Sequence, residues 1–251
     1  MRLESLVRFL DDYLRVTEEI ADAPEALNGL QVSNSGDVSR LAAAVDLCEA
    51  TVRQAAEQHA DCLLVHHGLF WGGLRPIVGP AFRRLAGLIK GNIALYAAHL
   101  PLDRHPEVGN NPVLARMLGV KLRGDFGSYH GAPAGVWGEY NGTREELSWA
   151  LTKALGTAPR IFPFGPERVQ RVGIVTGSGG SLIPQAAAAG LDTFVTGEGQ
   201  HWTFFDAEEL GINAFYAGHY ATETVGVKAL AEHVSKKFDL PWVFLDHPTG
   251  L

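Results

Sequence analysis

Hydrophobic positions along this chain follow two patterns: short continuous apolar runs, and stripes with helical spacing. Residues 3–14 place an apolar side chain every three to four positions, which predicts an amphipathic helix. In the first half, buried strands are predicted at 41–47, 61–65 and 93–98, with helices at 48–59 and 81–90. The second half predicts strands at 171–175, 193–195, 213–217 and 242–245, with helices at 181–189, 205–210 and 223–238.

This alternation predicts an α/β fold with two similar lobes and mostly parallel sheets, since a strand–helix–strand order produces parallel crossovers. We expect lobes at about 1–120 and 169–251. The segment 121–168 is predicted to link the lobes. It contains a strand-like run at 136–140 and a capping-box helix that starts at Thr143.

A short helix is also predicted just before the linking segment. Asn111 is expected to cap it, with Pro112 at its first position and Gly119 after its end. Proline is tolerated at the start of a helix, because the amide hydrogen it lacks would have no partner there.

Composition and charge exclude several classes of protein. The chain has 28 acidic and 21 basic residues, a net charge of -7 and no dense Lys/Arg cluster, so a nucleic-acid partner is not expected. The sequence shows no signal-peptide pattern and no apolar run near the ~20 residues that a membrane span needs. Cys48 and Cys62 form no CxxC motif and are interpreted as buried thiols in a reducing compartment. We therefore expect a cytoplasmic protein.

Polar side chains gather where the predicted strands end. They are His66, His67, His99, Asp103, Glu198, His219 and Glu223. In an open parallel sheet, ligands bind beyond the carboxyl ends of the strands, so these side chains are expected to lie together. Imidazole and carboxylate groups are natural ligands for borderline transition metals. The pattern favours a metal site at this edge.

Each candidate also has a simpler explanation. His66 and His67 could bind one ion each of a metal pair ~3.5–4 Å apart, or be one buried histidine and one exposed histidine. Asp103 could bridge two metals or be an ordinary turn residue. If the last long helix starts near residue 221, Glu223 lies in its first turn, where an acidic side chain is stabilised without any metal.

Weaker signals surround these residues. The turn at 176–180 (TGSGG) could cradle a phosphate with its amide hydrogens, or be only a turn. His99, Glu198 and His201 are candidates for proton transfer. The sequence contains no GxSxG motif and neither cysteine has a base nearby, so serine and thiol hydrolases are excluded.

Several motifs occur together in an order that is similar to one known family. They are NGLQV at 28–32, VHHGLFWG at 65–72, AHLPLD at 98–103, GNN at 109–111, TGE at 196–198 and AGHYATE at 217–223. With these motifs the chain closely resembles, over almost its whole length, the NIF-three-like family of YbgI-type dinuclear metal-binding proteins, often labelled GTP cyclohydrolase 1 type 2.

The resemblance implies a single domain over residues 1–251, made of two α/β lobes with a metal site between them. It implies two divalent metal ions, which iron, zinc or manganese would satisfy. It implies metal ligands at His66, His67, Asp103, His219 and Glu223, with Asp103 as the bridge. It also implies a toroidal homohexamer whose sites face an internal cavity.

Two functions fit these expectations. The first is a metal-dependent hydrolase of a small molecule such as a nucleotide or a pterin-like compound, with His99, Glu198 or His201 moving protons. The second is a non-catalytic metal-binding ring that serves as a scaffold or adaptor. Both predict bound metal, and they differ in whether turnover exists.

Overall fold

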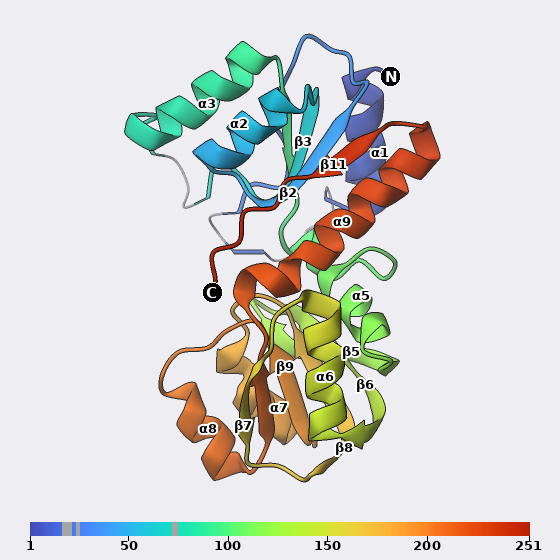
Figure 1. Cartoon of the computed structure of the whole chain (residues 1–251), viewed down its shortest axis with the longest axis vertical. Helices are drawn as coiled ribbons and strands as arrows, with labels where there is room; N and C mark the ends of the chain where they lie inside the picture. The colour runs from blue at the N-terminus through green and yellow to red at the C-terminus, as the bar shows by residue number, and fades with distance from the viewer. Residues whose placement is uncertain (17–21, 24–25, 72–74) are drawn as a thin grey trace. The chain divides into compact units, whose positions relative to one another are not determined.

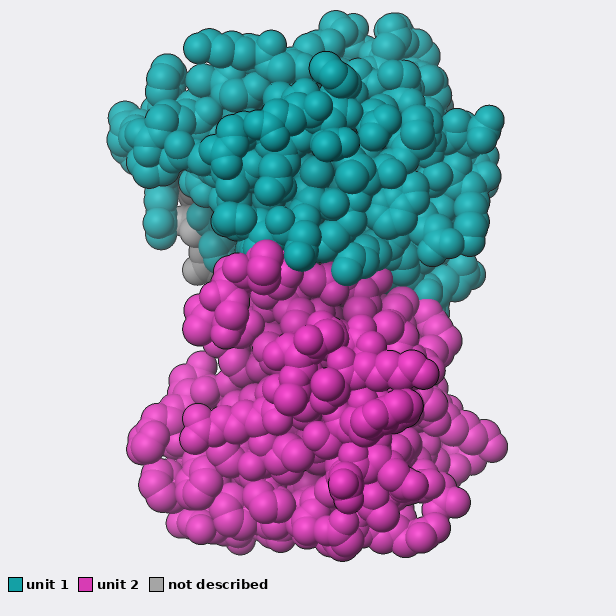
Figure 2. Space-filling view, in the orientation of Figure 1, with its two compact units in different colours: residues 1–108, 226–247 teal, residues 109–225, 248–251 magenta. Residues whose placement is uncertain are grey.

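The computed structural model describes residues 1–16, 22–23, 26–71 and 75–251. These residues form two compact units, shown in different colours in Figure 2: residues 1–108 with 226–247, and residues 109–225 with 248–251. Each unit contains its own β-sheet with helices packed on both faces. The predicted α/β class is therefore confirmed.

The first unit is built on a mostly parallel sheet (Figure 1). Its elements are α1 (Leu3–Leu14), β1 (Gly29–Val32), β2 (Leu41–Asp46), α2 (Glu49–Glu57), β3 (Cys62–His67), α3 (Gly79–Gly91), β4 (Ala94–Ala97), α4 (Leu100–Asp103), the second part of α9 (His219–Phe238) and β11 (Trp242–Phe244). The strand order is β1-β4-β3-β2-β11. All neighbours are parallel except β1, which pairs antiparallel with β4.

Different helices cover the two faces of this sheet, because side chains alternate along each strand. Leu63 and Val65 of β3 belong to a core cluster with residues of α2 and α3. The hydroxyl of Tyr96 donates a hydrogen bond to Asp11 Oδ1 at 2.9 Å, which places α1 on the opposite face. Since the central strands are buried on both faces, their sequences are continuous apolar runs rather than alternating ones.

The second unit is built on a mixed sheet. Its elements are α5 (Asn110–Met117), β5 (Lys121–Tyr129), β6 (Ala132–Thr143), α6 (Arg144–Leu155), β7 (Arg160–Pro163), β8 (Arg168–Val175), the 3₁₀ turn η1 (Gly180–Leu182), α7 (Ile183–Ala188), β9 (Thr193–Thr196), α8 (Thr203–Leu210), β10 (Asn213–Tyr216) and the first part of α9. The strand order is β5-β6-β8-β9-β10-β7. The three neighbours β8, β9 and β10 are parallel, whereas β6 and β7 run in the opposite direction.

Alternation along the strands again separates two cores. Val195 and Phe215 pack with residues of α5 and α6, whereas Phe194 and Ala214 pack with residues of α7 and α8. The central strands β8, β9 and β10 therefore end at one edge, with apolar support on each side.

The structure divides the chain differently from the predicted lobes. Residues 121–168 do not form a separate link, since β5, β6 and β7 pair into the second sheet. The predicted capping box of α6 is present, with Thr143 and Glu146 bonded reciprocally. The C-terminal residues 226–247 return to the first unit, where β11 pairs with β2. Such pairing depends on contacts between distant segments, which hydrophobic periodicity does not report.

Two helix ends also differ from the prediction. α5 is capped by Gly109, and Asn111 is inside the helix, where its side chain bonds to Thr176 and Ala134. α9 begins at His219, four residues earlier than the predicted range, because the amide of Thr222 already donates a helical hydrogen bond to the Gly218 carbonyl at 3.0 Å.

The two cysteines have different surroundings. Cys62 is buried in β3, and burial raises the pKa of its thiol to about 12. Cys48 is half-buried, and its sulfur accepts a hydrogen bond from the Thr51 amide at the start of α2. Within the described residues, no helix combines the length and the apolar character needed to cross a bilayer.

Candidate metal centre

In the first unit, the candidate residues follow two neighbouring parallel strands. His66 and His67 are the last two residues of β3, which extends to His67 because this residue still pairs with Asp46 of β2. His99 is the residue before α4, and Asp103 is the last residue of that one-turn helix. The turn after β4 therefore brings His99 and Asp103 to the edge at which β3 ends.

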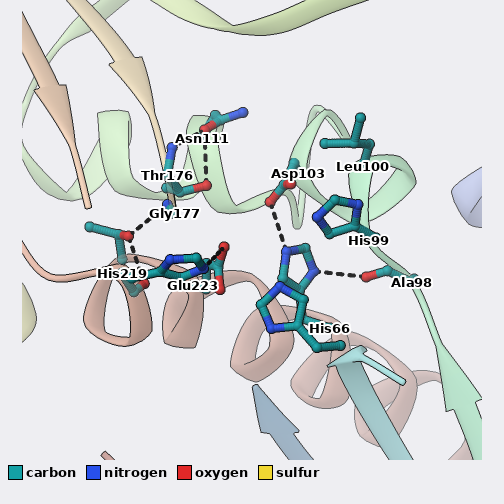
Figure 3. Close-up of polar contacts among 12 residues, drawn as sticks. His66, Ala98, His99, Leu100, Asp103, Asn111, Thr176, Gly177, His219 and Glu223 are labelled. Atoms are coloured by element: carbon teal, nitrogen blue, oxygen red, sulfur yellow. Dashed lines mark hydrogen bonds and ion pairs between the residues drawn. The ribbon is translucent and has the colours of Figure 1, made fainter. Parts of the chain in front are cut away.

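The three imidazole rings form one cluster. The ring centroid of His66 lies 4.7 Å from that of His67 and 4.9 Å from that of His99. One ring nitrogen from each of the three histidines lies within 4.8 Å of the others. Asp103 Oδ1 lies 3.6 Å from His66 Nε2, as the dashed line in Figure 3 marks. His66 and Asp103 are both buried, which is unusual for such polar groups unless they serve a site.

An oxygen atom holds the Nδ1 nitrogen of each histidine in this cluster. The pairs are His66 with Ala98 O at 2.8 Å, His67 with Asp46 Oδ1 at 2.8 Å, and His99 with Asp22 Oδ1 at 2.7 Å. A carbonyl or an ionised carboxylate can only accept, so each Nδ1 must carry the donated hydrogen. Each neutral ring then offers a lone pair on Nε2, which is the arrangement found around metal-bound histidines.

Asp22, the oxygen acceptor for His99, accepts further hydrogen bonds. Its Oδ2 accepts hydrogen bonds from Asn28 Nδ2 at 2.8 Å and from the Leu100 amide at 3.2 Å. Asn28 Oδ1 in turn accepts the amide of His99 at 2.7 Å. Burial opposes ionisation of the Asp22 carboxyl, but the bonds from His99 and Asn28 outweigh it and lower its pKa. The carboxylate is thus kept charged against His99.

The second unit holds a different set at the start of α9. His219 Nε2 lies 3.2 Å from Glu223 Oε1, one helical turn further on, and His219 Nδ1 lies 2.7 Å from Glu198 Oε1. Figure 3 shows the His219 ring beside Glu223. Burial alone would lower the pKa of His219, but the two carboxylates outweigh it and raise the pKa to about 9. In the metal-free protein this ring therefore carries a proton at neutral pH.

The glycine-rich turn supports this set rather than presenting its amides to a phosphate. The amides of Gly177, Gly179 and Gly180 donate to Thr222 Oγ1, Thr196 Oγ1 and Glu198 O. Gly177 has a φ of +68°, and a Cβ there would lie 2.2 Å from Glu223 Oε1. The phosphate-cradle hypothesis is therefore not supported for these three amides. Their glycines instead let the backbone pass close to the carboxylate.

The donor chemistry of both sets fits divalent cations. The described residues offer imidazole nitrogens with fixed tautomers and buried carboxylate oxygens, with no thiolate among them. Nitrogen and oxygen donors of this type suit zinc, iron and manganese, whereas soft cations prefer sulfur. The His66, His67 and His99 cluster can thus hold a metal ion.

The structure sorts the residues predicted from sequence into three groups. It brings His66, His67, His99 and Asp103 together in the first unit, and His219, Glu223 and Glu198 together in the second. His201 is exposed, and its ring packs against Phe205 with centroids 5.7 Å apart.

Two contributing carboxylates were missed by sequence reasoning. Asp46 could have been noticed as the single acid at the end of the apolar run in β2. Asp22 has no comparable signal, because it lies in an irregular passage and reaches His99 only through the fold, across 77 positions of sequence.

These features place the chain among α/β proteins that carry a histidine–carboxylate site able to hold a metal ion. The family model described as Duf34/NIF3 (NGG1p interacting factor 3) matches residues 1–249. The chain therefore belongs to the DUF34/NIF3 family, in agreement with the resemblance carried by its motifs.

Three relatives illustrate how close this similarity is. A Deinococcus radiodurans protein named GTP cyclohydrolase 1 type 2 homolog is 44% identical over 252 residues, covering 99% of this chain and 94% of that protein. The crystal structure of TTHA1606 from Thermus thermophilus has 47% identity and a TM-score of 0.90, with 100% of both chains covered. The structure of protein ybgI, described as of unknown function, has 38% identity and a TM-score of 0.92, also with 100% of both chains covered.

Proposed function

We propose that this chain binds two divalent cations through five side chains and hydrolyses a small molecule such as a nucleotide or a pterin-like compound. The ligands are His66, His67, Asp103, His219 and Glu223. The observation that carries the proposal is the orientation of the three ligand rings, because an oxygen atom accepts the Nδ1 hydrogen of His66, His67 and His219. Nε2 is then the ligand atom of each ring, in His219 after its second proton has left. The names of the curated relatives support the choice of a cyclohydrolase-like reaction.

The carboxylates have a separate role from the imidazoles. When bound, a pair of divalent cations polarises the electrophile and lowers the pKa of water. Asp103 and Glu223 supply the negative charge that offsets such cations, and both are buried, so solvent screens them little. Glu198 holds the hydrogen on His219 Nδ1, which makes it a positioning residue rather than the proton-transfer group suggested by its sequence position.

His99 is the best placed candidate for proton transfer. Its Nδ1 hydrogen is held by the charged Asp22, so Nε2 is free to accept a proton from water at the site. Asp22 then stabilises the positive charge that develops on the ring.

The test begins with protein purified without chelators or a metal-affinity tag. Elemental analysis should find about two divalent ions per chain, and a panel of nucleotides and pterin-like compounds should reveal turnover. Asp103→Asn should lose metal and activity together, because an amide bridges two cations poorly. His99→Asn should retain metal and lose ~10²-fold in rate or more.

Two results would reject parts of this proposal. Full activity in an Asp103→Asn protein that has lost its metal would reject a metal-dependent mechanism. Metal-replete wild type without turnover on the whole panel would favour a scaffold function instead.

We also propose that the chain forms a homo-oligomer, in line with the expected hexamer. An apolar stripe on and beside α3 supports this, since Val78, Phe82 and Ile89 are each more than half exposed at helical spacing. Light scattering after gel filtration should give the mass of several chains. A combined Phe82→Glu and Ile89→Glu variant should give a smaller mass without loss of helix content.

A further inference from the structure

Trp71 stands beside the histidine cluster of the first unit with much of its side chain in solvent. Its ring centroid lies 4.7 Å from that of His99 and 5.2 Å from that of His67, both in edge-to-face geometry. Nevertheless, 44% of the residue remains exposed. A large aromatic group exposed beside a polar cluster offers apolar surface at the point where the chemistry is expected.

Gln31 is hydrogen-bonded to the turn that contains Trp71. Gln31 Oε1 accepts the amide of Leu69 at 2.7 Å, and Gln31 Nε2 donates to the Leu27 carbonyl at 2.6 Å. A Cβ on Gly68 would lie 2.4 Å from Gln31 Nε2, so only glycine lets this amide approach so closely. The backbone is thus held two residues before Trp71, and the edge-to-face contacts with His67 and His99 orient the indole. Its surface therefore costs little further ordering when a ligand binds.

This arrangement also explains why two separate sequence motifs belong to one site. In the NGLQV motif, Asn28 bonds to the amide of His99 and Gln31 bonds to the amide of Leu69. The HHGLFW portion of the second motif supplies the ligand histidines and Trp71, while its final Gly72 lies outside the described residues. The first motif thus holds the backbone at His99 and at Leu69, two residues before Trp71.

We propose that Trp71 is a stacking platform for the planar heteroaromatic ring of the substrate, so that the site selects ring-bearing anions over ring-free ones. This inference rests on the proposed metal-dependent function and names its substrate class. Every nucleobase and pterin has a flat π-face, and stacking on an aromatic side chain is worth about 1–3 kcal/mol per base. The cations would attract the anionic part of the same molecule, while the indole would contact its ring.

The test uses guanosine triphosphate and inorganic triphosphate as a matched pair of probes, with and without the ring. Calorimetric titration of metal-loaded protein should show that Trp71→Ala weakens guanosine triphosphate binding by about tenfold or more. Binding of inorganic triphosphate should stay within about twofold, because that probe has no ring to stack. Trp71→Phe should keep most of the affinity, since it preserves an aromatic face. Trp149→Ala, at an exposed tryptophan of α6, is the matched control and should change neither probe.

Metal content separates stacking from a purely structural role of Trp71. If the indole only packs against His67 and His99, Trp71→Ala should lose metal and weaken both probes alike, which would overturn the proposal. Wild type that binds guanosine triphosphate no more tightly than triphosphate would also overturn it. So would a Trp71→Ala protein that binds both probes as wild type does.

Uncharged guanosine, titrated into chelator-treated protein, distinguishes this inference from the proposed function. Guanosine binding that depends on Trp71 supports stacking even if the protein proves to hold no metal. If Trp71→Ala protein that still binds metal has the same guanosine affinity as wild type, the stacking proposal is overturned and the proposed metal centre is not.

Discussion

The two candidate ligand sets of this protein differ in how the fold orients and charges their side chains. In the first unit, three imidazoles cluster at strand ends, and each is oriented by an oxygen atom at Nδ1. In the second unit, a single imidazole lies between Glu198 and Glu223, which raise its pKa to about 9. The rings of the first set have oriented lone pairs on Nε2. The ring of His219 in the second set carries a second proton, and so a positive charge, when no metal is bound.

This difference shows two ways in which a buried polar cluster can be stable while no metal ion is bound. Hydrogen bonds satisfy one nitrogen of each ring in the first unit, so these imidazole rings need no positive charge to be stable there. In the second unit, a buried carboxylate is tolerated because the protonated ring neutralises it. A cation that binds there must displace this proton, so its affinity should rise with pH.

The largest expected effect comes from removing a ligand of the first set. His66→Ala should lower metal affinity by about 100-fold or more, since even the removal of a group that only supports a ligand costs 10–100-fold. The increase in melting temperature on adding metal should shrink with it. Elemental analysis and thermal melts with and without metal measure both effects.

The control for this experiment is His130→Asn on the exposed turn between β5 and β6. Its positive φ of 49° is tolerated by asparagine, so neither metal content nor melting temperature should change much. A His66→Ala protein with a full complement of metal would show that the first set is not a ligand set.

In metal-free protein, the free energy of unfolding should depend on pH differently for the His219 set than for the histidine cluster of the first unit. The pKa of His219 is raised from 6.5 to about 9, so its ion pairing stabilises the fold fully below pH 6.5 and is lost as the pH rises through 9. The loss should be up to about 3 kcal/mol, and Glu223→Gln should flatten it. Denaturant unfolding across this pH range measures the slope.

Asp22→Asn is the matched comparison in the first unit. The pKa of the Asp22 carboxyl lies below its usual 3.8, so its contribution is present above that pH and is lost only in acid. Asp22→Asn should leave unchanged the slope of the unfolding free energy against pH between pH 6.5 and 9. An equal flattening by both variants would contradict the assignment of the alkaline loss to His219.

Carboxylates that orient the histidines should have intermediate effects. Asp46→Ala and Glu198→Ala should each lower metal affinity by about 10–100-fold, because the tautomer and direction of His67 or His219 are no longer fixed. Calorimetric titration with zinc measures the change. Asp46→Asn and Glu198→Gln should recover part of it, since an amide oxygen still accepts the Nδ1 hydrogen. Absence of this recovery would argue against tautomer control.

The smallest effects should come from glycines that support the two sets. Gly177→Ala should destabilise the fold by about 1–2 kcal/mol, because its φ is positive and the new Cβ meets Glu223. Gly68→Ala has ordinary φ and meets only the flexible end of Gln31, so it should cost about 1 kcal/mol or less. Thermal melts measure the loss of stability in both variants. A larger loss for Gly68→Ala than for Gly177→Ala would contradict this prediction.

Local sequence was sufficient for most of the elements. The helix at 3–14 was predicted at its observed bounds, and the strands predicted at 41–47 and 193–195 differ from the observed ones by one residue at one end. These segments have strong periodicity or continuous apolar runs, and their burial follows directly from composition. The placement of His66 and His67 at a strand end followed from the same patterns.

Tertiary structure decided the pairing of distant segments and the state of each histidine. The sequence could not show that β5, β6 and β7 join the second sheet, because strand pairing is set by contacts across many residues. Nor could it show that Asp22 and Asp46 fix the tautomers of His99 and His67, since a hydrogen bond depends on distance and angle rather than on residue type. The motifs identified which residues are candidate ligands. Only the folded chain determined which ring nitrogen of each histidine can bind a metal.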